Sequence, residues 1–455
     1  MKPNALFNQP PGLYYLFFTE MWERFSYYGM RSLLVLYMTE HLIGRVQQGQ
    51  TVFGFPALQN WLESLLGGMS QQALASQIYG LYTGLVYFTP FFGGLLADSV
   101  LGQRRTIILG GLLMAAGHFT MAFESLFLPA LLLLILGNGC FKPNISTQVG
   151  GLYPDNDPGR DAAFTLFYMG INLGAFMAPL VCGTLGQFYG WHFGFAAAGV
   201  GMLISLLIYQ SGQKYLPPDR RNKNAARPTG AQTKPDAPLS GAEWRVIAAL
   251  AVLAVVNIVF WAVYEQQGNT LQLFVEHEAD RRIFGWEMPS TWFQALNPIL
   301  IILLSPLLAG LTARLAAAGF APSGVTKMAL GSMLLGASFL ILMYATAGAA
   351  EGVKTGLHWL ALCNLIYTLG ELLMSPVGLS LVCRVSPPKI ISMLMGMWFM
   401  SSFFGNYLSG YIGGFYGLLS RPRFFLMLAA LGIAAGLIIL LLRKALEKTL
   451  EPLND

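Results

Sequence analysis

Residues 20–31, EMWERFSYYGMR, place four charges inside a long apolar segment of the chain. The residues before them read GLYYLFFT, and those after them read SLLVLYM. A charged side chain at the centre of a membrane helix costs about 2.5–3.5 kcal/mol even on a lenient insertion scale. Charges kept at this cost face the interior of a helical bundle, so the segment predicts a membrane helix with one polar side.

The composition of the whole chain is typical of a membrane protein. Of its 455 residues, 55% are hydrophobic and only 11% are charged, whereas a soluble domain carries about 25% charge. The apolar runs are about twenty residues long, which is the length of a membrane helix rather than of a membrane strand. The four cysteines lie in or beside these runs, which favours burial over disulfides or metal ligation. We therefore expect an all-α integral membrane protein without a metal site.

Twelve segments are predicted to be transmembrane helices in two bundles of six. They cover about residues 13–40, 72–97, 105–124, 127–150, 161–187, 191–212, 243–274, 289–315, 323–346, 355–383, 388–416 and 422–443. A polar, proline-rich linker (213–242) would separate an N-terminal bundle (1–212) from a C-terminal bundle (243–455). The positive charges favour cytoplasmic termini and a cytoplasmic linker, in the inner or plasma membrane of the cell. In the long first outer loop, WLESLL predicts a short interfacial helix.

The two predicted bundles share a short repeat. TPFFGGLLAD (89–98) ends the second helix of the first half, and SPLLAGLTAR (305–314) ends the second helix of the second half. A repeat in the same sense predicts two bundles related by an axis along the membrane normal, which is the major facilitator arrangement. That fold places its binding site near the middle of the membrane, between the bundles.

Charged and aromatic residues of the first helix share one face. At 100° per residue, positions 20, 23, 24, 27, 28 and 31 fall within an arc of about 140°. Such a stripe either locks helices together through salt bridges or serves transport, and we favour transport because buried charges in membrane proteins mark ion and substrate pathways.

Three further charges lie inside predicted helices: Lys142 in the first half, and Glu265 and Glu371 in the second. With Glu20 and Glu23, the buried glutamates outnumber the buried cations by one, so a single proton would balance the set. We expect pairs across the bundles, Arg31 with Glu265 and Lys142 with Glu371, to close one gate or the other. For Glu371, a local hydrogen bond is the alternative.

Neutral polar and aromatic residues complete the expected cavity. Asn172, Asn297 and Ser402 would either bind a ligand or hold helices together by hydrogen bonds. The aromatic residues would either pack between helices or line pockets for ligand side chains; they are Tyr27, Tyr28, Tyr82, Trp261 and Trp398.

EMWERFSYYG resembles the E-x-x-E-R-F-x-Y-Y-G signature of the proton-dependent oligopeptide transporter family, within the major facilitator superfamily. Other stretches resemble the family in the second to fifth, seventh, eighth, tenth and eleventh helices, namely YGLYTGLVYFTPFFGGLLADSVLG, GNGCFKPNIST, FTLFYMGINLGAFMAPL, FWAVYEQQG, LNPILI, GELLMSPVGLS and MGMWFMSSFFGNYLSG. The chain departs from many bacterial members, because its linker is too polar and too short for two extra helices. It also has no histidine in the second helix, where animal members use one.

The resemblance implies symport of di- and tripeptides with protons, without another cofactor, by a monomer in the lipid bilayer. It implies a proton-coupling set of Glu20, Glu23, Arg24, Arg31 and Glu265. The peptide carboxylate would meet Arg24, Lys142 and Tyr28, with Arg31 beside them. Glu371 would meet the peptide amine, helped by Asn172 and Asn297. The pockets for peptide side chains would be shaped by Tyr82, Trp261, Trp398 and Ser402.

Four rival functions follow from the same sequence. A facilitator for nitrate would not need Glu371 to bind an amine, and a proton-driven drug exporter would rarely carry this signature and basic pair. A receptor or scaffold without transport is the third rival. An enzyme is disfavoured because the loops contain neither GxGxxG nor GxxxxGK[ST]. The net charge of +5 is explained by cytoplasmic loops, so no nucleic-acid partner is expected.

Overall fold

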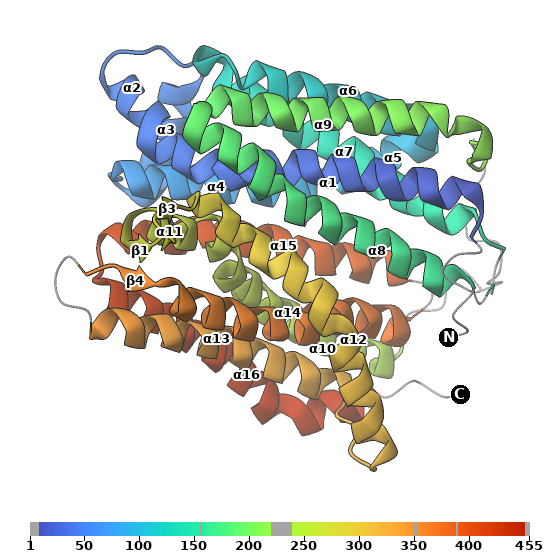
Figure 1. The fold of residues 1–455 in the computed structure, drawn as a ribbon. Coiled ribbons are helices and arrows are strands. Elements are labelled where there is room, and N and C mark those ends of the chain that lie inside the picture. Colours follow the sequence, from blue (N-terminus) through green and yellow to red (C-terminus); the bar gives the residue numbers. More distant parts are fainter. Residues whose placement is uncertain are drawn as a thin grey trace.

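The computed structural model describes residues 9–154, 157, 159–219, 239–348, 353–387 and 390–450. Long helices run side by side through this part of the chain (Figure 1). Among the described residues, nine helical runs are long and apolar enough to cross a membrane: 71–101, 124–151, 159–189, 191–211, 241–278, 290–317, 324–347, 357–385 and 421–449. The centre of the predicted linker, residues 220–238, lies outside the described residues.

The first half of the chain forms the upper group of helices in Figure 1. Within it, α1 packs on α8 and α9, and α6 packs on α7 and α9. Its helices are α1 (Pro11–Tyr37), α2 (Ile43–Gln47), α3 (Phe55–Leu66), α4 (Gln71–Phe88), α5 (Pro90–Leu96), α6 (Gln103–Thr120), α7 (Phe127–Gly151), α8 (Gly159–Ala178) and α9 (Trp191–Ser211). α3 contains WLESLL, so a helix forms where the sequence predicts one.

The second half forms the lower group, in which α13 packs on α14 and α16, and α10 packs on α15. Its helices are α10 (Gly241–Tyr264), α11 (Thr270–Glu278), α12 (Leu296–Ala317), α13 (Gly324–Ala347), α14 (Leu357–Val385), α15 (Ile391–Gly414) and α16 (Arg421–Thr449). A capping box starts α10, because Ser240 accepts a hydrogen bond from the Glu243 backbone and the Glu243 side chain accepts one from Ser240.

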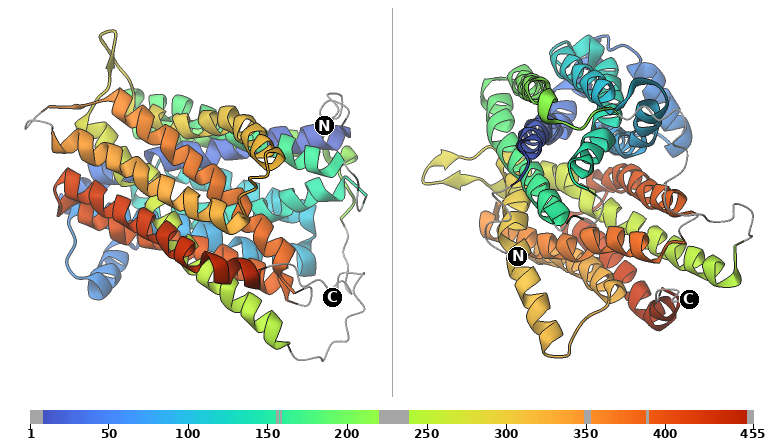
Figure 2. Two further views of the ribbon diagram at one scale, coloured as in Figure 1. Left: turned by 90° about the horizontal axis from the view of Figure 1, so that it is seen from below. Right: turned by 90° about the vertical axis from the view of Figure 1, so that its right-hand side faces the viewer.

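The two groups meet along α4 and α15, and also where α8 contacts α12. Glycine makes the first contact possible. A Cβ atom added to Gly80 would lie 2.7 Å from the Cα atom of Gly410, so no larger residue fits there. An end-on view in Figure 2 shows the two groups side by side.

Two predicted helices are interrupted in the structure. The second predicted helix is divided into α4, which ends at Phe88, and α5, which begins at Pro90. The division falls here because proline lacks the N–H that would continue the helix. The seventh, predicted as one helix over 243–274, changes to a 3₁₀ turn at Glu265–Gly268 and restarts at Thr270. Its backbone at Asn269 is non-helical (φ −112°, ψ −104°).

Within the described ranges, four two-residue strands add to the expected all-α chain. β1 (Ala279–Asp280) pairs with β4 (Thr355–Gly356), and β2 (Arg282–Ile283) forms a hairpin with β3 (Trp286–Glu287). We call the end of the bundle that carries this hairpin and α3 the hairpin end. The opposite end, where α1 begins and α16 ends, is called the terminal end (Figure 1).

Candidate functional site

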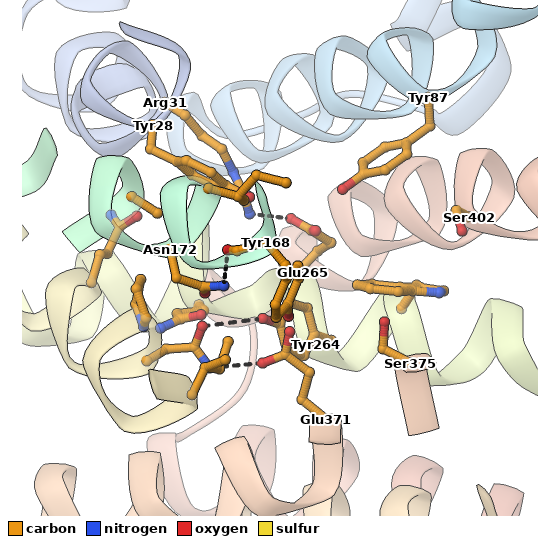
Figure 3. Close-up of a pocket in the computed structure, with 18 of the residues that line it drawn as sticks. Tyr28, Arg31, Tyr87, Tyr168, Asn172, Tyr264, Glu265, Glu371, Ser375 and Ser402 are labelled. Carbon is orange, nitrogen blue, oxygen red and sulfur yellow. Dashed lines mark hydrogen bonds and ion pairs between the residues drawn. The ribbon is translucent and has the colours of Figure 1, made fainter. Parts of the chain in front are cut away.

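A cavity of about 300 Å³ lies between the two groups of helices, lined from one side by α1, α4, α7 and α8 and from the other by α10, α12, α14 and α15. Figure 3 shows polar and aromatic side chains from both groups pointing toward each other across it. Most of the predicted site residues line this cavity, namely Tyr28, Arg31, Lys142, Asn172, Trp261, Glu265, Asn297, Glu371, Trp398 and Ser402.

Arg31 and Glu265 form the predicted ion pair between the two halves. The Nη2 atom of Arg31 donates a hydrogen bond to Glu265, and its Nε atom donates to the Tyr79 hydroxyl at 2.8 Å. Only 1% of the Glu265 side chain is exposed. The 3₁₀ turn that begins at Glu265 packs closely here, since a Cβ atom on Gly268 would lie 2.1 Å from the Tyr79 hydroxyl oxygen.

Arg24 lies in a separate buried cluster rather than in the cavity lining. Its Nε atom is 3.1 Å from Glu20 Oε1, and its Nη2 atom donates to Glu23 Oε1 at 2.8 Å. Asn138 also donates to Glu23 Oε1, at 3.4 Å. The family resemblance placed Arg24 in a proton-coupling set with Glu20 and Glu23 and also against a peptide carboxylate. In this structure the guanidinium contacts these two glutamates of its own helix.

Lys142 and Glu371 both line the cavity, yet no ion pair joins them in the described part of the chain. The Lys142 Nζ atom lies 4.5 Å from the centre of the Tyr87 ring, which is a cation–π contact. Glu371 accepts a hydrogen bond from Asn297 Nδ2 at 2.8 Å. The predicted pair is therefore absent here, and the local hydrogen bond that was its alternative is present.

The predicted neutral and aromatic residues divide between cavity and packing. Trp398 lines the cavity and lies against Gly378, where a Cβ atom would be 2.4 Å from its ring. Asn172 donates to the Tyr168 backbone oxygen at 3.0 Å, which holds its side chain on its own helix. Tyr82 is not in the lining: it is buried, and its hydroxyl has no hydrogen-bond partner among the described residues.

Several lining residues were not predicted, and three of them carry a simple signal. They lie four positions from predicted ones on the same helix: Asn257 from Trp261, Tyr168 from Asn172 and Ser375 from Glu371. Residues four apart share a helix face, so extending each predicted position by one turn would have found them. Tyr87, Tyr264, Gln267 and Gln294 also line the cavity and do not follow this rule from a predicted residue.

Hydrogen bonds join the two groups at the hairpin end. Gln187 donates to Glu276 at 2.6 Å and to Ser290 at 3.0 Å. The Trp292 ring N–H donates to Thr184 at 2.8 Å. His277 and Glu40 lie 3.0 Å apart. Together with the Arg31–Glu265 pair, these contacts hold the two groups together on this side of the cavity.

Membrane helices in two groups around a central charged cavity define a membrane transporter of the major facilitator fold, as the sequence predicts. The sequence model of the POT family matches residues 104–233 and 239–421. The chain therefore belongs to the POT family, which confirms the family resemblance seen in the sequence.

Named relatives match nearly the whole chain. It is 33% identical over 476 residues to "Peptide transporter YePEPT" of Yersinia enterocolitica subsp. palearctica serotype O:3 (strain YE-P4), covering 90% of this chain and 88% of the relative. It is 33% identical over 511 residues to "Di-/tripeptide transporter" of Lactococcus lactis subsp. cremoris, covering 98% and 97%. A crystal structure of "peptide transporter POT in complex with sulfate" matches with a TM-score of 0.83 and 32% identity, covering 97% and 96%.

Proposed function

We propose that this protein imports di- and tripeptides together with protons by alternating access. The names of its relatives support peptides as the substrate. The single observation that carries the proposal is the pair of opposite charges that line one cavity without bonding each other, Lys142 from the first half and Glu371 from the second. A short peptide offers both complementary charges, a carboxylate and an ammonium.

The spacing of the peptide charges explains why such a clamp selects short peptides. Every peptide has an amine, a carboxylate and a backbone, whatever its side chains, and the backbone of a dipeptide is only about 7 Å long. In our proposal Lys142, with Tyr28 nearby, meets the carboxylate, and Glu371 meets the amine. Asn297 already donates to Glu371 at 2.8 Å, which keeps this carboxylate directed at the cavity.

Proton coupling is proposed to rest on three carboxylates at two sites. Protonation of Glu265 would neutralise the charge that holds Arg31 and so release the pair that joins the two halves. Protonation of Glu20 or Glu23 would free Arg24, which could then reach the peptide carboxylate. No cofactor other than the proton enters this scheme.

The proposed topology has twelve membrane helices in two six-helix bundles, residues 1–212 and 243–455, joined by a cytoplasmic linker. The terminal end would face the cytoplasm of a cell membrane, because Arg104, Arg105 and Arg314 lie in loops or helix ends on that side. The structure would then be closed toward the outside by Arg31–Glu265 and accessible from the cytoplasm. We propose that a monomer is the functional unit.

Uptake of labelled dialanine into proteoliposomes tests the proposal directly. We expect accumulation with an inward proton gradient and only equilibration without one. Excess unlabelled dialanine should compete, whereas excess alanine or nitrate should not. Alanine carries both charged ends but too close together, and nitrate carries no positive end. Competition by nitrate alone would favour the nitrate carrier, and uptake without any gradient dependence would contradict proton coupling.

A further inference from the structure

The β2–β3 hairpin projects from the side of the helical bundle. Its strands pair Arg282 with Glu287 and Ile283 with Trp286. Both views in Figure 2 show the hairpin extending beyond the outline of the helices, across their axes rather than along them. The hairpin lies at the level where the apolar helices end, and the apolar core of a bilayer ends at the same level.

The residue at the tip is unusual for a turn. Phe284 and Gly285 both have positive φ angles, 49° and 83°, as in the two-residue turns that favour Asn, Asp or Gly. Phe284 is the only non-glycine residue with a positive φ in the described chain. Its side chain is also fully exposed in the structure, at 106%. Both the backbone and contact with water disfavour a large aromatic residue at this position.

Polar and aromatic contacts fix the base of the hairpin to the bundle. The Arg281 guanidinium is buried and donates to Glu276 Oε1 at 2.8 Å. The Trp286 ring packs against Trp292, with 5.3 Å between the ring centres, and against Phe188, with 6.3 Å. These contacts join the hairpin to elements of both groups of helices.

We propose that the hairpin tip, formed by Ile283 and Phe284, is inserted into the headgroup region of the lipid bilayer. Aromatic side chains are enriched at this depth because they have an apolar body and tolerate polar surroundings. Arg282 is exposed beside the tip and can bind a lipid phosphate. Burial in lipid would explain why Phe284 is apolar although both the turn conformation and contact with water disfavour such a residue.

A second element supports an anchoring role at this end. Figure 2 shows α3 on the opposite side of the bundle from the hairpin, and it exposes Trp61 and Leu65. The first half would thus rest on the bilayer through α3, and the second half through the hairpin. Two anchors on opposite sides would maintain the orientation of the bundle in the bilayer while its halves move.

Photo-crosslinking from the tip tests the proposal in the full chain. The photoreactive p-benzoylphenylalanine replaces Phe284, and the protein is reconstituted into vesicles of phosphatidylcholine and phosphatidylglycerol. The control carries the same residue in place of Gln48, which is exposed after α2 at the same end. We expect a mass increase of one phospholipid at 284, at least fivefold above the control. Equal adducts at both positions, or a crosslink to another protein copy instead, would overturn the proposal.

A second variant separates lipid contact from the shape of the turn. With the crosslinker in place of Ile283, Phe284→Asn should lower the yield of lipid adduct at least threefold. Asparagine suits the positive φ and therefore retains the hairpin, but it offers no apolar surface. An unchanged yield would show that Phe284 does not hold the tip in lipid. Elution of each variant as one symmetrical gel-filtration peak confirms that the chain is folded.

Discussion

Two pairs of opposite charges line the same cavity, and only one of them is bonded. Arg31 and Glu265 form an ion pair that joins the two halves, with Tyr79 as a further partner of Arg31. Lys142 and Glu371 have no such bond; the first lies over the ring of Tyr87, and the second accepts from Asn297. Both pairs consist of a cation from the first half and a glutamate from the second, but only Arg31 and Glu265 form an ion pair in this structure.

This difference indicates a different role for each pair in transport. A bonded pair between the halves stabilises one conformation, because separating it would leave two buried charges without partners. Charges that line a cavity without bonding each other remain available to a zwitterionic ligand. We therefore assign the gate to Arg31 and Glu265 and the ligand clamp to Lys142 and Glu371, and the following predictions test this assignment.

The largest effect is expected from truncating the clamp. Lys142→Ala or Glu371→Ala leaves one charged end of the peptide without a partner, which costs about 2–5 kcal/mol. Dialanine binding should weaken about thirtyfold or more, as measured by calorimetry on purified protein. The control is Lys214→Ala, an exposed lysine after α9. Parental affinity in both clamp variants would contradict the assignment.

Removing a charge from the gate should impair proton-driven accumulation of peptide without preventing peptide binding. Glutamine is nearly isosteric with protonated glutamate, so Glu265→Gln fixes the neutral state of this residue. We expect counterflow of labelled peptide to continue while proton-driven accumulation falls at least tenfold. Glu20→Gln and Glu23→Gln should act in the same direction, and Glu63→Gln on α3 is the control outside the bundle. Full accumulation in all three buried variants would place the proton site elsewhere, with Glu371 as the next candidate.

Double-mutant cycles can sharpen the comparison without any substrate. Residues in direct contact show coupling energies of about 0.5–3 kcal/mol. The cycle of Arg31→Met and Glu265→Gln should fall in this range when thermal unfolding is followed in detergent. The cycle of Lys142→Met and Glu371→Gln should give coupling near zero. Equal coupling in the two cycles would mean that the clamp is also bonded in solution.

The smallest effect is expected at the neutral contacts of the hairpin end. Gln187→Ala removes hydrogen bonds to Glu276 and Ser290, and each contributes only about 0.5 kcal/mol because both are partly exposed. The population opened at this end should rise about fivefold, which pulsed EPR distances between labels on α3 and the hairpin can measure. Gln59→Ala is the control, because the hydrogen bond from Gln59 to Glu63 lies within α3. A response as large as that of Glu265→Gln would show that the gate is not mainly electrostatic.

Much of the site could be predicted because buried charges are rare and costly in membrane helices. Each charged residue singled out from the sequence is buried or lines the cavity, and the Arg31–Glu265 pair was expected across the halves. The contacts of Arg24 with Glu20 and Glu23 follow from their spacing on one helix, but its absence from the cavity lining could not be predicted. The position of Tyr82 could not be predicted either, because it shares a helix with the lining residue Tyr87 and yet is enclosed by neighbouring helices.

By itself, the sequence determined the membrane class, most of the helices, the family and the set of charges available for transport. These properties follow from local hydropathy and from the cost of charge in lipid, which do not depend on distant residues. Only the tertiary structure decided which charges meet. Arg31 and Glu265 are 234 positions apart, and their contact requires the helix to break at Glu265–Gly268 and pack against Tyr79. The projecting hairpin depends on the fold in the same way, because its direction is fixed by contacts between distant segments of the chain.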